Sequence, residues 1–104
     1  MTGPLLSVGP GVIRDTVRLA ALEVPGVIRV GRGGPRWRDV LAGSPVKVRI
    51  RDGRVHVTLW VVARPRQPLA ALGEEVRGAV GAAVVRLLGL ELGGVTVMVD
   101  GVGG

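Results

Sequence analysis

The chain has 104 residues, which is the length of one ordinary domain. It contains no cysteine, and this excludes disulfide bonds, thiolate metal sites and cysteine nucleophiles. Lysine and arginine outnumber aspartate and glutamate by 14 to 8, and the net charge of +6 favours anionic partners such as nucleic acid, anionic lipid headgroups or acidic proteins.

The start of the chain, MTGPLLSVGPG, has neither a basic region nor an apolar run of secretory length. We therefore expect no signal peptide and a cytoplasmic protein. The most apolar stretch, residues 78–90, is interrupted by Arg86 and is shorter than the ~20 apolar residues that a membrane-spanning helix needs. We expect residues 1–10 and 101–104 to be flexible.

The first predicted element is an amphipathic helix over Val12–Val24. Its apolar face carries Ile13, Val17, Ala20 and Val24 at helical spacing. The proline and glycine that follow end the helix, and Val27–Val30 is predicted as a strand. A strand at Leu5–Val8 and one helical turn within residues 36–42 are further candidates.

The clearest pattern predicts a β-hairpin over residues 46–62. Two runs of alternating residues are joined by Asp52 and Gly53, which tolerate the positive φ angles of a two-residue turn. The turn fixes the register, which pairs Arg51 with Arg54, Ile50 with Val55, Val48 with Val57 and Val46 with Leu59. One face of the hairpin is then aliphatic. The other face carries Lys47, Arg49, Arg51, Arg54, His56, Thr58 and Trp60.

Leu69–Leu88 is predicted as a long second helix. Its core face carries Leu69, Leu72, Val76, Val80, Ala83, Val84 and Leu87. Gly89 is a candidate C-terminal cap, and Val95–Val99 alternates as a last strand. The strand, helix and strand between residues 54 and 99 should form a right-handed crossover within one sheet.

Together the elements predict an α/β (α+β) fold in a single domain over residues 1–104. It consists of one small mixed sheet with a central β-hairpin and two helices packed on one face. Because both helices cover the aliphatic face, the basic face of the hairpin is left available to a partner.

The order of several short motifs resembles the alkaline shock protein family of bacteria. The motifs are LAALEVPGV, DGRVHVTLWVV, the helix closed by Leu88-Gly89-Leu90, and VTVMVDGV, within residues 12–102. The resemblance implies a small cytoplasmic α/β protein without catalytic residues, linked to envelope stress and often found near the membrane through partner proteins. The second helix departs from the family pattern, because small and apolar residues replace the charges that are usual on its outward side.

The composition offers little material for catalysis. The single histidine, His56, lies beside Arg49 across the predicted hairpin and has no partner expected within hydrogen-bond reach, so we do not expect an enzyme. One histidine and no cysteine leave only scattered carboxylates, so we expect neither a metal site nor a cofactor.

A glycine-rich segment, Gly31-Arg32-Gly33-Gly34, matches the G-x-x-G loop with which KH domains clamp a nucleic-acid backbone. In that fold the loop joins two helices, whereas a strand precedes it here. Because the chain has 18 glycines, a plain flexible turn is the favoured interpretation.

The basic hairpin face is the first candidate binding surface. Its candidate anion-binding and partner-binding residues are Lys47, Arg49, Arg51, Arg54, His56 and Trp60. The pairing of Arg51 with Arg54 destabilises the hairpin by roughly 0.2–1 kcal/mol unless an anion or an acidic neighbour offsets it. A merely solvated face is the alternative.

The outward strip of the second helix is the second candidate surface. It comprises Ala71, Gly78, Gly81, Ala82 and Val85. Small residues three and four positions apart let another surface approach closely, so we expect a weak homodimer through this strip. A compositional bias toward glycine and alanine is the alternative.

The preferred function is a non-catalytic interaction or scaffold protein of the alkaline shock type, which binds a protein partner at or near the membrane and serves envelope or membrane-proximal stress homeostasis. The alternative is a small nucleic-acid-binding module that uses the same basic face, since single-strand binders combine cations with aromatic stacking. Against this alternative, the chain has only two aromatic residues, both tryptophan, whereas RNA-recognition sheets offer several.

Overall fold

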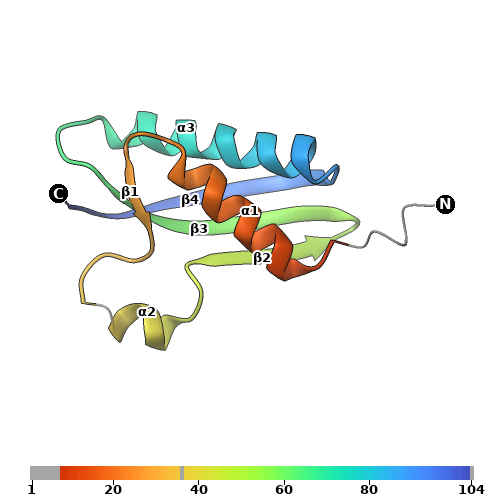
Figure 1. Ribbon diagram of the computed structural model, residues 1–104, viewed down its shortest axis with the longest axis horizontal. Helices are drawn as coiled ribbons and strands as arrows, with labels where there is room; N and C mark the ends of the chain where they lie inside the picture. The colour runs from red at the N-terminus through yellow and green to blue at the C-terminus, as the bar shows by residue number, and fades with distance from the viewer. Residues whose placement is uncertain (1–7, 36, 104) are drawn as a thin grey trace.

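A computed structural model describes residues 8–35 and 37–103 of the chain. Its elements are α1 (Pro10–Leu22), β1 (Val27–Val30), α2 (Trp37–Ala42), β2 (Val46–Arg51), β3 (Arg54–Ala63), α3 (Leu69–Ala82), the π-helical turn η2 (Ala83–Leu87) and β4 (Glu91–Val102) (Figure 1). The candidate strand Leu5–Val8 lies outside the described residues except for Val8, which belongs to no strand.

The sheet is organised around β3. β4 pairs with β3 in parallel along its whole length, so β2 and β1 share the opposite edge, where both run antiparallel to β3. β2 pairs with the first part of β3 and β1 with its end. The sheet is therefore mixed, and the parallel strands β3 and β4 are joined by the α3 crossover, as the sequence predicts. The fold is α+β.

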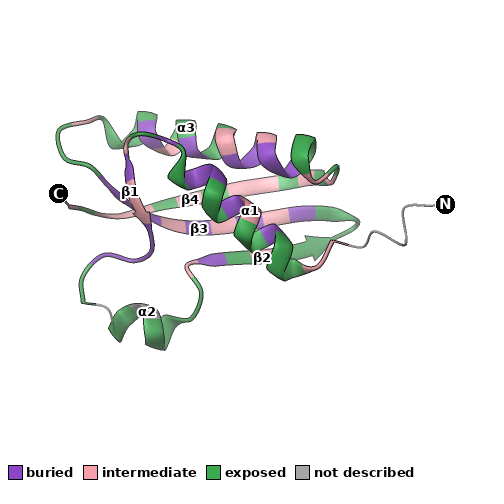
Figure 2. Cartoon of the chain, in the orientation of Figure 1, coloured by how far each residue is buried: buried purple, intermediate pink, exposed green. Residues whose placement is uncertain are grey.

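Both long helices pack on one face of this sheet (Figure 1). The predicted apolar face of α1 is confirmed for Ile13, Val17 and Ala20, which are all buried. The helix ends at Leu22 rather than at the predicted Val24, which is buried in the turn that follows. These side chains meet the buried side chains of β3, which alternate with half-buried ones from Val55 to Val61, and the last residues of the strand are all buried (Figure 2). The core thus forms between one sheet face and two helices.

The end of the second helix differs from the prediction. Leu87 was expected in the core but is 76% exposed, and Leu69 at the other end is 41% exposed. The cause at the C-terminal end is the π-helical turn, in which the backbone N–H of Leu88 donates to the carbonyl of Ala83. One more residue per turn rotates the positions after Ala83 away from the helical pattern.

The sheet also extends beyond the predicted limits. β4 begins at Glu91 and continues through Gly101 and Val102, where the sequence predicted fraying, and the N–H of Gly103 donates to the carbonyl of Ala63 at 2.9 Å. Near the hairpin tip Ile50, on the edge strand β2 and expected on the aliphatic face, is 55% exposed, whereas its partner Val55 on β3 is buried.

Candidate functional site

The hairpin turn builds the basic face. Asp52 and Gly53 adopt φ angles of 52° and 75°, the positive values of a two-residue turn. The register is the predicted one, with Arg51 opposite Arg54 and Arg49 opposite His56. Because successive side chains alternate between the faces of a strand, this register places every second residue of β2 and β3 on the side away from the helices.

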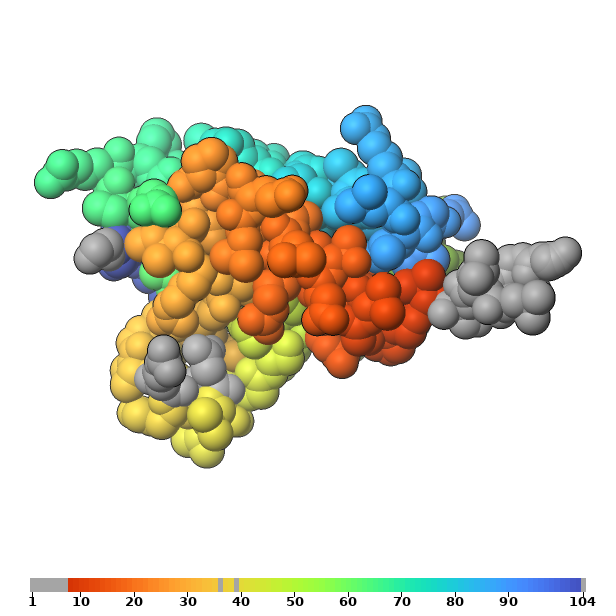
Figure 3. All heavy atoms as spheres, in the orientation of Figure 1, coloured from red at the N-terminus to blue at the C-terminus, as the bar shows by residue number. Residues whose placement is uncertain are grey.

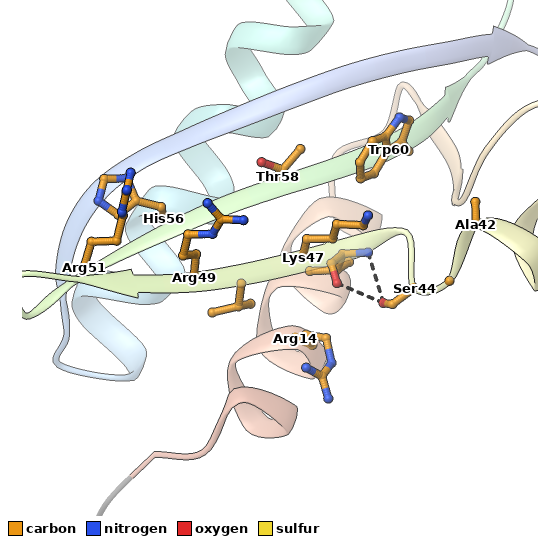
Figure 4. A pocket seen from close by; sticks show the side chains of 12 residues that line it. Arg14, Ala42, Ser44, Lys47, Arg49, Arg51, His56, Thr58 and Trp60 are labelled. Carbon is orange, nitrogen blue, oxygen red and sulfur yellow. Dashed lines mark hydrogen bonds between the residues drawn. The ribbon is translucent and has the colours of Figure 1, made fainter.

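The structure brings the predicted basic residues together on that side. Figure 4 shows Lys47, Arg49 and Arg51 of β2 beside His56 and Trp60 of β3, all on the same side of the sheet. Arg54 is paired with Arg51 across the turn and therefore lies on the same side of the sheet. The four cations of the hairpin are exposed, whereas His56 and Trp60 are half-buried.

The basic face continues past the edge strand β2. An open hollow lined by the β2 and β3 side chains also includes Arg14 of α1 and the loop residues Gly43 and Ser44 (Figure 4). Sequence analysis did not include these three residues, because α1 precedes the hairpin by more than twenty positions and lies mostly behind the sheet.

His56 has a packing partner rather than a catalytic one. The register between β3 and β4 shifts at this point, since Val55 pairs with Leu92 and His56 with Gly94, so Gly93 is an extra bulged residue. The His56 ring lies against the Gly93 backbone, where a Cβ atom would collide with it. Within the described part of the chain no hydrogen bond or ion pair involves His56, which leaves it without the acidic partner that a general base uses.

Trp60 is held by an arginine that sequence analysis did not select. Arg32, only 7% exposed, places its guanidinium 4.3 Å from the centre of the Trp60 ring. The same guanidinium donates to the carbonyls of Gly43 and Ser44, at 3.0 and 3.5 Å. Arg32 therefore fastens the loop after α2 to the sheet. No sequence pattern indicates this contact, because it joins Arg32 to two separate segments, the loop at Gly43 and Ser44 and the strand at Trp60.

Replacing Arg32 with lysine should loosen this contact. A lysine cannot provide the planar stack and the forked hydrogen bonds together, so we expect a loss of about 2 kcal/mol in unfolding free energy. In a Trp37→Leu background, which leaves Trp60 as the sole tryptophan, acrylamide should quench the fluorescence more strongly after Arg32→Lys. Unchanged quenching would contradict the stacked arrangement.

The G-x-x-G segment is engaged within the fold. The Gly33 N–H donates to Oδ2 of Asp100 at 3.0 Å, and a Cβ atom at Gly33 would collide with the Asp100 carbonyl. Arg38 donates to the Gly33 carbonyl at 2.8 Å and lies 4.0 Å from the same carboxylate. The segment thus anchors the loop to β4, which accounts for its glycine without a nucleic-acid backbone.

The outward strip of the second helix is not continuous. Ala71, Gly78 and Val85 are exposed as predicted. Gly81, expected on the outward side, is buried, and its Cα faces Leu92 of β4 closely enough that a Cβ atom would lie 3.1 Å from that side chain. Ala82 is half-buried and faces α1 across a groove. Both positions belong to the regular part of the helix, and they are covered because β4 packs against one flank of α3 and α1 lies along the other.

Comparison with solved structures finds chains that share the fold of this one. A methionine-to-leucine variant of MamM CTD is 19% identical, with a TM-score of 0.57 over 88% of this chain and 95% of that chain. A histidine-to-alanine variant is 17% identical, with a TM-score of 0.59 over 89% and 98%. A copper form of MamM CTD is 17% identical, with a TM-score of 0.57 over 88% and 85%.

At these identities the likeness shows the fold alone. No family model and no curated protein sequence matches the chain, so the resemblance to the alkaline shock family stays a prediction.

The copper of the MamM CTD form has no counterpart in the side chains here. Across residues 8–35 and 37–103, no three His, Cys, Asp or Glu side chains gather into a group that could hold a metal ion. The chain's only histidine, His56, lies opposite Arg49 and packs on the Gly93 backbone, so these residues do not fit a copper site. In the same described ranges, no helix has the length and apolar character needed to cross a membrane.

Proposed function

We propose that this chain is a non-catalytic interaction domain whose basic sheet face binds the acidic surface of a partner protein. One observation carries the proposal: Lys47, Arg49, Arg51 and Arg54 lie side by side, exposed, on a sheet face that no helix covers. Among the residues that the structure describes, no ion pair involves any of the four.

The acidic side chains near this face form no ion pair with its four cations among the described residues. Glu91 of β4 is paired with Arg54 in the sheet register. Asp100 on β4 is engaged by the Gly33 N–H and lies 4.0 Å from Arg38. Asp52 lies in the turn and forms no ion pair among the described residues. Arg51 and Arg54 lie directly opposite each other, an arrangement that destabilises a hairpin unless an anion or an acidic neighbour offsets it, and Glu91 is such a neighbour for Arg54 only. Even with Glu91 and Asp52 nearby, the face carries more exposed cations than carboxylates, so it keeps a net positive charge that favours a negatively charged partner.

The environment of Trp60 favours a protein partner over single-stranded nucleic acid. Proteins that bind single strands stack bases on exposed aromatic rings. The Trp60 ring is half-buried, stacked by Arg32 and approached by Lys47, whose Nζ lies 5.6 Å from the ring centre. The cations are thus available to an anion, but the aromatic ring is already occupied.

The alkaline shock resemblance supports a finer proposal, in which the acidic partner is a protein at or near the cell membrane and the complex serves envelope stress homeostasis. The residues that carry the resemblance act in the fold: Gly89 has a φ of +67°, and a Cβ atom at Gly26 would collide with Gln67 and Leu72. These glycines are required by the backbone of this fold, whereas the choice of partner depends on the basic face.

The proposal predicts that Arg49→Gln, Arg51→Gln and Arg54→Gln together weaken binding to an acidic peptide. Exposed charge pairs contribute about 0.2–1 kcal/mol each, so removing three should raise the dissociation constant about tenfold. The probe is a fluorescent polyglutamate peptide, measured by anisotropy at low and at physiological salt. Thermal stability should stay the same or rise slightly, because the Arg51 and Arg54 repulsion is lost.

The matched control removes three exposed arginines elsewhere, with Arg18→Gln, Arg66→Gln and Arg77→Gln, and lowers the net charge by the same amount. Binding should change little in this control. An equal loss of affinity in both triple variants, or unchanged affinity in the Arg49, Arg51 and Arg54 variant, would refute a specific site on the basic face. If single-stranded RNA bound the basic sheet face more tightly than polyglutamate does, the nucleic-acid alternative would be favoured.

A further inference from the structure

An apolar groove lies on the helical side of the molecule, away from the basic face. It runs between α1 and the end of the second helix, where these segments lie side by side at the surface (Figure 3). Its base is formed by alanines, Ala20 on one side and Ala82 and Ala83 on the other. Its rims carry Leu19, 63% exposed, and Leu87, 76% exposed.

The π-helical turn creates this groove. A regular helix would direct Leu87 toward the core, as the sequence predicts, whereas the extra residue of the turn places Leu87 and Arg86 beside Ala82 and Ala83. The large apolar side chains of Leu19 and Leu87 are therefore exposed to solvent beside the small alanines at the base of the groove. This arrangement resembles the ridges and grooves through which helices pack on one another.

The two ends of the groove carry opposite charges. Glu23 follows the last residue of α1, and Arg86 lies in the last turn of the second helical run. α1 and α3 run in roughly opposite directions in Figure 1, so Glu23 and Arg86 lie at opposite ends of the groove. No ion pair joins Glu23 or Arg86 to another described residue.

We propose that this groove is a self-association surface whose occupant is a second copy of the chain, placed by a two-fold axis across the groove. That operation sets Glu23 of each copy against Arg86 of the other, and brings the leucine rims of one copy over the alanine base of its partner. A partner with one uniform charge would meet repulsion at one end, whereas an identical copy meets the complementary charge at both.

This surface differs from the outer helical strip that the sequence predicted. It includes Ala82 but leaves Ala71, Gly78 and Val85 outside. Because the groove and the basic face lie on opposite sides of the sheet, the dimer would present two basic faces outward. Dimerisation by the groove stands independently of the proposed function.

A charge-swap series tests the arrangement by sedimentation velocity over a wide concentration range. Glu23→Arg and Arg86→Glu should each weaken dimerisation about tenfold or more, since each turns two attractive contacts into repulsive ones. The double variant should restore the affinity of the original chain. Both positions are exposed, so the fold should tolerate each change.

Leu87→Glu should abolish the dimer, and the matched control is Leu41→Glu on α2, where the leucine is 77% exposed and remote from the groove. That control should dimerise normally. A chain that stays monomeric at every concentration would overturn the proposal. So would a dimer that the double swap fails to restore, or one broken by Gly78→Arg and not by Leu87→Glu.

Discussion

Replacing Leu59 with alanine should lower the free energy of unfolding by about 3 kcal/mol, because a leucine that is fully buried leaves a cavity that its neighbours fill only in part. Leu59 has no exposed surface and lies in the central strand, paired with Val46 of β2 and Val97 of β4. For a domain of this size the loss should lower the melting temperature by about 15 °C.

The matched control is Leu41→Ala, since Leu41 is the same residue type but 77% exposed. Its effect should stay within about 0.5 kcal/mol, as for ordinary surface substitutions. Differential scanning calorimetry of both variants checks the pair. Equal effects at the two positions would show that β3 is not the centre of the core.

The parts of the fold that the sequence predicted are those encoded over short distances. The hairpin register followed from the two turn residues, Asp52 and Gly53, and was confirmed pair by pair. The apolar face of the first helix followed from the spacing of Ile13, Val17 and Ala20. In both cases neighbours along the chain decide the structure.

The features that sequence analysis missed depend on distant residues. The π-helical turn that exposes Leu87 has no local signal, because the same apolar spacing fits a regular helix. The bulge at Gly93 becomes visible only once β4 is paired with β3. Adjacent glycines at 93 and 94 could have indicated an irregular strand, since a glycine within a strand often marks a bulge.

The candidate site divides in the same way. The residues on the basic face could be named from alternation alone, because strand geometry places every second side chain on one side. The residues that border this face could not be predicted from the sequence. Arg14 approaches from another element, and Arg32 contacts Trp60 only because of how the loop folds. Alternation along the strands predicts which residues share the basic face, but long-range packing decides which of their side chains stay exposed to a partner.

The contact between the glycine-rich loop and β4 leads to a second large expected effect. Gly33→Ala should destabilise the fold by about 2 kcal/mol or more, because the new Cβ atom would collide with the backbone carbonyl of Asp100, which cannot rotate away as a side chain would. Any shift that relieves the collision also strains the hydrogen bonds from the Gly33 N–H to Asp100 and from Arg38 to the Gly33 carbonyl.

The same substitution at Gly78 should have the opposite sign. Gly78 lies in the exposed side of α3, and a Cβ atom there meets nothing within 4 Å. Alanine should therefore stabilise the helix by about 0.5–1 kcal/mol, since it loses less backbone entropy on folding than glycine. Urea denaturation of Gly33→Ala and Gly78→Ala measures both. If Gly33→Ala were neutral or stabilising, the glycine-rich loop would not lie against β4. The contact between Gly33 and Asp100 would then not explain how Arg32 is positioned on Trp60.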